Sequence, residues 1–223
     1  MTSAIIVAAG NSRRMGFNKL LASLAGVAVL RRTLRAFQAC EELDEIIVVG
    51  GEEVQEAIAE WRDEFPKLAA VISGGAERHL SVWAGIQACS PTAKIIAVHD
   101  GARPLIRPAQ IAKCLQGAEE HGAVACARPM TETLKRVDAA GQIIDSVDRT
   151  SVWVMETPQV FRRELLLQAY ESVMSAGALV TDEVSALQHL GEPVLVIENS
   201  EPNPKITFPA DLLFAEKHLD ENL

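Results

Sequence analysis

The sequence has few aromatic residues, no long apolar run and a deficit of basic residues. Aromatic side chains make up 4% of its 223 residues. No apolar run approaches the ~20 residues of a membrane helix, and no basic segment with a long apolar core precedes the first predicted strand, so we expect no secretory signal. The formal net charge of −9 disfavours binding to a nucleic-acid backbone. These absences predict a cytoplasmic protein that binds neither membrane nor nucleic acid.

Cysteine is also scarce, and its spacing excludes two common uses. Cys40, Cys89, Cys114 and Cys126 lie far apart and form no C-x-x-C pair. Each has apolar neighbours, which favours reduced core thiols over disulfides or zinc ligands. The composition, 48% hydrophobic and 23% charged, is that of an ordinary globular protein. The length predicts one α/β domain, with or without an appendage, and a full core.

Two familiar nucleotide-binding motifs are missing from the start of the chain. A dinucleotide fingerprint requires G-x-G-x-x-G after a strand, but only Gly10 and Gly16 occur there, too far apart. A Walker loop ends in G-K-[ST], whereas two residues separate Gly16 from Lys19. A dehydrogenase is therefore the weakest functional candidate.

The first segment nevertheless has the composition of a polyphosphate-binding loop. Residues 4–9 form a short apolar run typical of a buried strand, and Gly10 ends it. Small residues then alternate with Arg13, Arg14 and Lys19, and no acidic residue lies among them. Backbone N–H groups and fixed positive charge suit an anion. The alternative is an ordinary surface loop with solvated arginines.

Alternating strands and helices predict a mostly parallel sheet covered on both faces. The predicted strands cover residues 4–9, 44–50, 69–75, 94–98, 122–127 and 193–199, and the predicted helices cover residues 27–40, 52–65, 108–121, 162–176 and 209–219, with another that opens at 181–183. In such sheets, ligands bind beyond the carboxyl ends of the strands. We therefore expect the site at that edge.

Residues 130–161 break this pattern. The runs 133–137, 143–149 and 152–161 are short and partly alternating, which is typical of ribbons that project from an α/β body. A lone ribbon is marginally stable unless it packs on something. We therefore predict a single domain over residues 1–223, with a β-arm at about 130–161 that forms a homodimer.

Asp100 is the strongest metal-binding candidate. It follows the predicted strand 94–98, and one or two carboxylates together with phosphate oxygens suit Mg²⁺. The alternative is a local ion pair between Asp100 and Arg103. His99 has no partner in the sequence and is interpreted as a packing or hydrogen-bonding residue.

Several segments carry a family resemblance. The first resembles the A-A-G-x-x-x-R-M…K signature of nucleotidyltransferases that act on sugar and polyol phosphates, most closely the 2-C-methyl-D-erythritol 4-phosphate cytidylyltransferase family. Further similar segments are E-T-L-K-R at 132–136, S-V-D-R at 146–149, T-P-Q-V-F at 157–161 and N-P-K-I-T at 203–207. The resemblance implies a Rossmann-like three-layer α/β fold, with a mostly parallel central sheet and a protruding β-arm.

The resemblance also implies a reaction. A phosphate oxygen of 2-C-methyl-D-erythritol 4-phosphate would attack the α-phosphorus of CTP in line and expel pyrophosphate, with Mg²⁺ or another divalent cation as cofactor. The implied catalytic residues are Arg14, Lys19 and Lys205. The implied nucleotide-binding residues are Ala8, Ala9, Gly10, Gly74, Gly75, Ala76, Ser81 and Asp100, the last also the metal ligand. The implied acceptor-binding residues are Arg103, Thr133, Arg149 and Thr181, with Thr133 and Arg149 reaching into the neighbouring subunit.

Four departures from the family pattern leave alternatives open. Ala76 and Glu132 stand where the family commonly has Asp, Pro204 replaces a typical Ile, and Lys19 lacks its usual preceding Pro. One alternative is the same chemistry on another acceptor, such as ribitol 5-phosphate. Another is a non-catalytic homologue that binds CTP without releasing pyrophosphate. From the residues alone, 74–81 would be a plain strand-to-helix turn, and Thr181 or Asp182 would be the N-cap of a helix.

Overall fold

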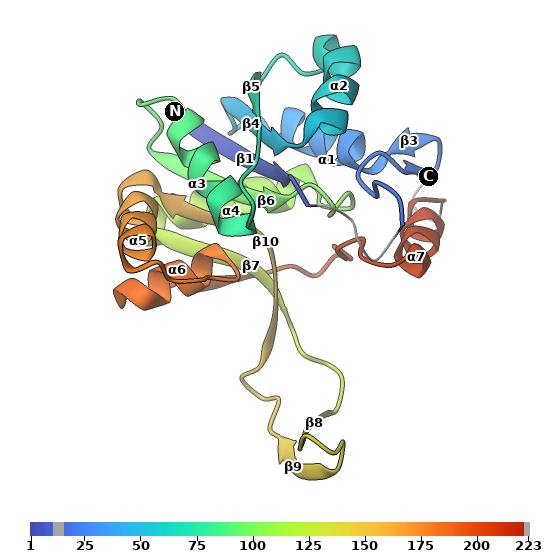
Figure 1. Cartoon of the computed structure of the whole chain (residues 1–223), viewed down its shortest axis with the longest axis vertical. Coiled ribbons are helices and arrows are strands. Elements are labelled where there is room, and N and C mark those ends of the chain that lie inside the picture. Colours follow the sequence, from blue (N-terminus) through green and yellow to red (C-terminus); the bar gives the residue numbers. More distant parts are fainter. Residues whose placement is uncertain (11–15, 221–223) are drawn as a thin grey trace.

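A seven-stranded sheet forms the centre of the molecule (Figure 1). The computed structural model describes residues 1–10 and 16–220. The strand order is β11-β7-β10-β6-β1-β4-β5. The strands are β1 (Thr2–Ala8), β4 (Glu45–Gly50), β5 (Leu68–Ile72), β6 (Ile95–Asp100), β7 (Ala123–Pro129), β10 (Trp153–Arg162) and β11 (Leu195–Glu198). All neighbours are parallel except β10, which is antiparallel to β6 and β7. The predicted mostly parallel sheet is confirmed.

Helices cover both faces of this sheet, which gives three layers. One face carries α1 (Val29–Gln38), α2 (Glu52–Trp61) and α4 (Pro108–His121), and the other carries α3 (Arg78–Ala88), α5 (Arg163–Ala176) and α6 (Glu183–Leu190).

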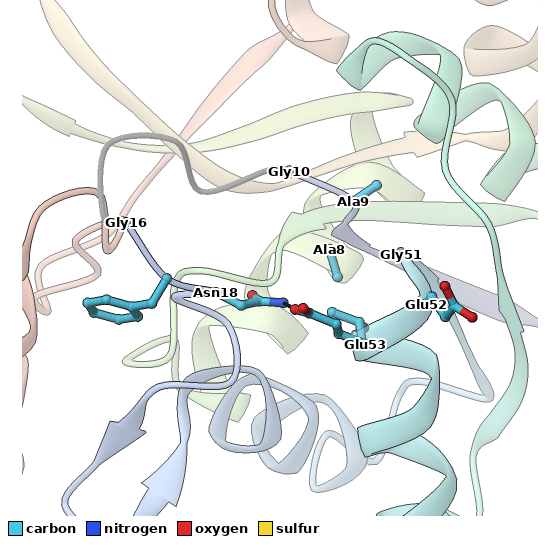
Figure 2. A pocket seen from close by; sticks show the side chains of 10 residues that line it. Ala8, Ala9, Gly10, Gly16, Asn18, Gly51, Glu52 and Glu53 are labelled. Carbon is cyan, nitrogen blue, oxygen red and sulfur yellow. Dashed lines mark hydrogen bonds between the residues drawn. The ribbon is translucent and has the colours of Figure 1, made fainter.

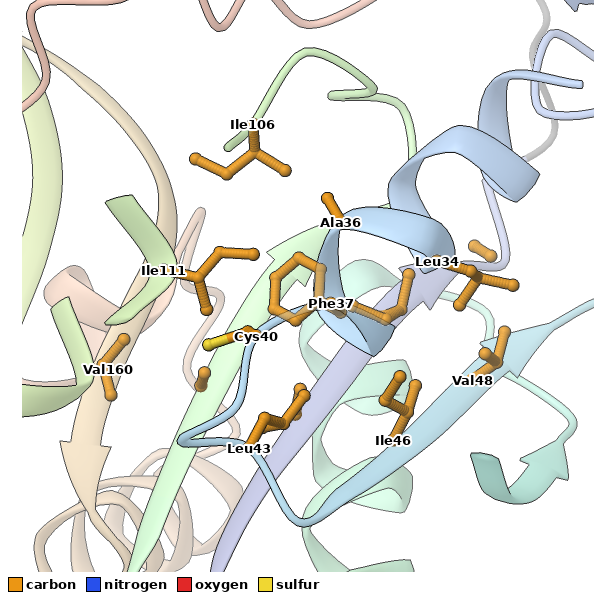
Figure 3. Packing of buried hydrophobic residues seen from close by; sticks show 14 of the residues in the cluster. Leu34, Ala36, Phe37, Cys40, Leu43, Ile46, Val48, Ile106, Ile111 and Val160 are labelled. Atoms are coloured by element: carbon orange, nitrogen blue, oxygen red, sulfur yellow. The ribbon is translucent and has the colours of Figure 1, made fainter. Parts of the chain in front are cut away.

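Consecutive residues of each central strand supply opposite cores. Ile6 belongs to the cluster under α1, α2 and α4, whereas Ile5 belongs to the cluster under α3, α5 and α6. Figure 3 shows Phe37 of α1 packed in the first cluster, near Ile111 of α4 and Ile46 of β4. Burial on both faces explains why these strands read as unbroken apolar runs.

A third, smaller cluster holds the C-terminal helix. The short hairpin β2 (Ser23–Leu24) and β3 (Val27–Ala28) precedes α1, and a short 3₁₀ helix, Arg62–Glu64, follows α2. Leu24, Leu105 and Ile206 pack with Ala215 of α7 (Pro209–Asp220). This packing fixes the chain around Ile206, directly beside Lys205.

Residues 152–161 differ from the prediction. They were expected to form part of the projecting ribbon, but only Trp153–Met155, which pair with β7 alone, lead into it. Residues 159–161 lie in the central part of the sheet, paired with both β6 and β7. The pairing of β10 with β7 shifts register between Met155 and Gln159, around Pro158. Proline lacks the N–H that a regular central strand needs, so its presence argued against this assignment. The local irregularity accommodates it.

The projecting arm consists of the outer hairpin and the strand ends that lead to it. β8 (Leu134–Val137) and β9 (Ile143–Val147) pair antiparallel and lie well away from the body (Figure 1). Val137, Ile143 and Ile144 are 55%, 68% and 59% exposed. The arm therefore has apolar side chains but no core of its own.

The four cysteines are buried and unpaired, as predicted. None of the helices in the described part of the chain is long and apolar enough to cross a membrane.

Candidate active site

The carboxyl ends of β1 and β5 bring several predicted nucleotide-binding residues into contact. A Cβ atom on Gly74 would lie 2.3 Å from Cβ of Ala9 and 2.8 Å from Oγ of Ser81, so only glycine allows this close approach. The Ser81 hydroxyl accepts the Gly75 N–H (3.1 Å) and donates to the Glu77 carbonyl (3.2 Å). The segments around residues 9, 75 and 81 thus form one continuous surface.

A pocket of about 510 Å³ opens beside this surface (Figure 2). Ala8 at the end of β1 and the following Ala9 and Gly10 line it, and the start of α2 forms another wall. Residues 16–18 line the pocket as well, and Asn18 donates from Nδ2 to Oε2 of Glu53 (2.8 Å), which connects this segment to α2. Ala76 is exposed, and Arg14 lies outside the described residues.

Asp100 is the centre of the charged part of the site. It ends β6, is 7% exposed, and lies among three cationic side chains. Nζ of Lys205 is 2.8 Å from Oδ2, Nε of Arg78 is 3.3 Å from Oδ1, and Nε of Arg103 is 3.7 Å from Oδ2. The ion pair with Arg103, considered above as the alternative to metal binding, is therefore present as one part of a larger cluster.

These cations keep the carboxylate ionised. Burial alone would raise the pKa of Asp100, but the charges of Arg78, Lys205 and Arg103 outweigh that effect and hold the pKa well below its usual range. Asp100 is thus a fixed negative charge that aligns cations from three parts of the chain.

Lys19 of the N-terminal segment contacts the backbone next to this cluster. Its Nζ donates to the Ile206 carbonyl (2.7 Å), and the Ile206 N–H donates to the Ala102 carbonyl (2.8 Å). Segments around residues 19, 102 and 206 therefore meet beside Asp100. Pro204 departs from the family pattern, yet Lys205 still reaches the carboxylate.

Arg103 holds the same region together through backbone carbonyls. Its Nη1 donates to the Asn203 carbonyl (2.8 Å) and its Nη2 to the Met155 carbonyl (3.5 Å). Its side chain is 12% exposed. In this arrangement, Arg103 contacts the Lys205 segment rather than open solvent.

Arg78 and Glu183 are site residues that the sequence interpretation missed. Arg78 makes a bidentate pair with the buried Glu183, with Nη1–Oε1 2.7 Å and Nη2–Oε2 3.1 Å, and Tyr170 also donates to Oε1 (2.9 Å). Burial alone would lower the pKa of Arg78, but Glu183 and Asp100 raise it overall. From the sequence, Glu183 is an acidic residue at a helix N-terminus, which capping alone explains. Its partner Arg78 is 105 residues away, so no local pattern connects the two.

The start of α6 also places Thr181. Asp182 is the N-cap, accepting the Ser185 N–H (2.9 Å), while Thr181 is exposed and contacts the Ser185 hydroxyl (3.3 Å). Of the two capping candidates, the structure selects Asp182. Thr181 lies two residues before Glu183, and Arg78 contacts both Glu183 and Asp100. Thr181 is therefore connected to the Asp100 cluster through Glu183 and Arg78.

His99 lies behind the cluster as a buried packing residue. Thr157 Oγ1 is 3.0 Å from Nδ1 of His99 and also accepts the Asp100 N–H (3.1 Å). The ring packs on Phe37 at 4.8 Å between centroids. Burial lowers the pKa of His99 to about 3, so the ring is neutral at physiological pH. This agrees with its predicted role.

The arm residues are not brought to this cluster within one chain. Thr133 and Arg149 are exposed, and the Arg149 guanidinium donates to the Thr131 carbonyl. The arm points away from the body in Figure 1. Any contact of these two residues with the Asp100 cluster would have to come from another copy.

Asp100 can supply only some of the oxygen ligands that a magnesium ion needs. Among residues 1–10 and 16–220, no group of three or more His, Cys, Asp or Glu side chains could hold a metal ion. Mg²⁺ usually binds through one or two carboxylates plus phosphate oxygens. An ionised Asp100 supplies one such carboxylate, and a bound nucleotide would have to supply the other oxygens.

Comparison with known proteins identifies the family. A model of the family "IspD: 2-C-methyl-D-erythritol 4-phosphate cytidylyltransferase" matches residues 2–221. The chain is 39% identical over 221 residues to the enzyme of that name from Symbiobacterium thermophilum, covering 98% of this chain and 93% of the relative. It is 40% identical over 214 residues to the one from Parasynechococcus marenigrum, covering 95% of each.

Solved structures agree. The 4-diphosphocytidyl-2C-methyl-D-erythritol synthase of Anaerococcus prevotii superposes with a TM-score of 0.88 at 28% identity, covering 99% of this chain and 96% of that one. The 2-C-methyl-D-erythritol 4-phosphate cytidylyltransferase of Thermus thermophilus gives 0.80 at 29% identity, covering 99% and 100%. With a match over nearly its whole length, this chain belongs to the 2-C-methyl-D-erythritol 4-phosphate cytidylyltransferase family.

Proposed function

We propose that this protein condenses CTP with 2-C-methyl-D-erythritol 4-phosphate to give 4-diphosphocytidyl-2-C-methyl-D-erythritol and pyrophosphate. Its family membership supports this reaction. The structural observation that carries the proposal is the Lys205–Asp100 ion pair at the carboxyl ends of the strands, where α/β proteins bind nucleotides. Lys19 adds a second cation nearby, bonded to the carbonyl of Ile206.

The attacking group is an oxygen of the acceptor phosphate. A phosphate monoester has its second pKa near 6, so at neutral pH the nucleophile is mostly ionised and needs no general base. His99, neutral and enclosed between Phe37 and Thr157, is not required to accept a proton. The protein must instead hold two anions in line.

Positive charge performs that task. Lys19 and Lys205, joined by Arg14 according to the family signature, offset the repulsion between the phosphates and stabilise charge that grows in the transition state. Asp100 orients Lys205 and would hold the divalent cation. When bound, that cation would neutralise phosphate oxygens.

Two sets of residues recognise the substrates. Ala8, Ala9 and Gly10, with the turn from Gly74 through Ala76 and with Ser81, bind the nucleotide. Their supporting observation is the close packing of Ala9, Gly74 and Ser81. Arg103 and Thr181 bind the acceptor, together with Thr133 and Arg149 from the arm of a second copy. We therefore propose a homodimer that joins through the arms, and a cytoplasmic location stays a prediction.

The direct test is pyrophosphate release from CTP and 2-C-methyl-D-erythritol 4-phosphate, with and without Mg²⁺. We expect release that depends on both the metal and the acceptor. Ribitol 5-phosphate serves as the matched acceptor, and faster turnover with it would reassign the substrate. CTP binding without pyrophosphate release, measured by calorimetry under the same conditions, would contradict the proposed reaction.

A further inference from the structure

Glu156 is a buried carboxylate that the proposed reaction does not use. It is 3% exposed and lies on β10 where the pairing with β7 shifts register. Its Oε2 accepts hydrogen bonds from Nδ2 of Asn199 and Nδ2 of Asn203, both at 3.0 Å, and its Oε1 is 3.5 Å from Nε of Arg128. Burying a carboxylate is costly, so these charge-assisted bonds hold the two asparagines firmly.

Asn203 transmits this restraint to the lysine. Besides Glu156, its Nδ2 donates to the Thr157 carbonyl (2.9 Å), and its own carbonyl accepts Nη1 of Arg103 (2.8 Å). Lys205 follows two residues later. With Asn203 fixed on one side and Ile206 bonded to Ala102 on the other, the backbone that carries Lys205 has little freedom.

The same corner of β10 also holds Asp100. Thr157, directly after Glu156, accepts the Asp100 N–H through its hydroxyl (3.1 Å). Asp100 and Asn203, the residue two positions before Lys205, are therefore both hydrogen-bonded to the consecutive residues 156 and 157.

We propose that Glu156 is a positioning residue that sets Lys205 against Asp100. It acts through Asn203, without touching the substrates itself. The proposal rests on the proposed function, because Lys205 is taken as a catalytic cation. It predicts that Glu156 affects turnover beyond its effect on folding.

The test uses Glu156→Leu, which keeps similar volume but leaves the two asparagine amides without their acceptor. We expect kcat for pyrophosphate release to fall about tenfold or more, as is typical when a group that supports a site residue is lost. Glu156→Gln, whose amide oxygen can still accept both bonds, should restore kcat to within about threefold of wild type.

Glu45→Leu is the matched control. Glu45 is also buried, at 6% exposure, and it accepts the Ser90 N–H (2.7 Å). It is the first residue of β4 and so lies at the amino ends of the parallel strands, away from Asp100. We expect a loss of thermal stability in both leucine variants, and a loss of kcat per folded molecule only in Glu156→Leu.

A double-mutant cycle with Lys205→Ala identifies the path of the effect. If Glu156 acts through Lys205, Glu156→Leu should cost little further activity once Lys205 is removed. Wild-type kcat in folded Glu156→Leu, or losses that multiply independently, would overturn the proposal. Should Glu156→Leu fail to fold, Asn203→Ala provides the same test, and unchanged kcat there would also overturn it.

A second measurement does not depend on turnover. The rate of reductive methylation of Lys205, followed by peptide mass spectrometry, should rise in Glu156→Leu as the ion pair loosens, and stay unchanged in Glu45→Leu. If wild-type protein releases no pyrophosphate, the proposed function fails. The methylation rate of Lys205 still tests Glu156 in that case. An unchanged rate in Glu156→Leu would overturn the proposal that Glu156 positions Lys205.

Discussion

The Asp100 cluster and the arm, the two regions on which the proposed reaction depends, are built in opposite ways. Asp100 lies within a seven-stranded sheet and is surrounded by Arg78, Arg103 and Lys205. The arm is a two-stranded ribbon whose apolar residues, such as Ile143, face solvent. The cluster is therefore preorganised within one chain, whereas a ribbon without a core needs something to pack against.

Removing Lys205 tests the cluster and should have the largest effect. Lys205→Ala deletes the cation 2.8 Å from Asp100. We expect the barrier to rise by about 3 kcal/mol, which lowers kcat about 100-fold, because one group that stabilises the transition state is lost. Pyrophosphate release measures this. Lys113→Ala, on the exposed surface of α4, is the control, and near-wild-type turnover of Lys205→Ala would remove Lys205 from the mechanism.

Neutralising Glu183 tests how the cluster is supported. Glu183→Gln leaves Arg78 without its bidentate carboxylate partner in a largely buried setting. We expect a loss of about 2 kcal/mol in the free energy of unfolding, less than for a fully buried pair because Arg78 is partly exposed. Urea denaturation measures this loss. The exposed Glu171→Gln on α5 is the control, and equal stability of both variants would show that the pair contributes nothing.

Removing Arg149 tests the arm. Arg149→Ala should raise KM for the acceptor about tenfold, which corresponds to one lost charge-assisted contact to phosphate. Arg136→Ala, also exposed on the arm, is the control. An unchanged KM in Arg149→Ala would exclude the arm from acceptor binding.

Mixing two impaired proteins, assayed at an acceptor concentration well below KM, extends this test to the dimer. If each arm serves the other subunit, a mixed dimer of Arg149→Ala and Lys205→Ala contains one intact site. An equimolar mixture should then recover about one quarter of wild-type activity after subunit exchange. No recovery after confirmed exchange would show that each arm serves its own chain.

Lowering the pH should produce the smallest effect, and only in the buried region. The pKa of His99 is lowered to about 3, so the unfolded chain binds a proton near pH 6.5 that the folded chain does not. Stability from this residue is present above pH 6.5 and decreases as the pH falls towards 3. Between pH 7 and pH 6, wild type should lose about 0.7 kcal/mol more than His99→Gln in urea denaturation. An identical pH dependence in the two proteins would contradict the neutral, buried imidazole.

The sequence predicted the layered sheet well because its signals are local. An apolar run such as residues 4–9 identifies a strand buried on both faces, and the spacing of Val29, Leu34 and Phe37 identifies a helix. The position of Asp100 at a strand end follows from the same pattern. The prediction failed at β10, because Pro158 and the register shift hide a central strand behind the appearance of a ribbon.

The sequence by itself determined the α/β class and, through motifs, the residues proposed to act at the carboxyl ends of the strands. Only the tertiary structure decided which distant side chains meet. Glu183 joins Arg78 across 105 residues and Glu156 joins Asn203 across 47, because the strand order of the sheet brings together helices and loops that are far apart in sequence. Local patterns encode periodicity and burial, whereas such pairings depend on the strand order that the folded chain adopts.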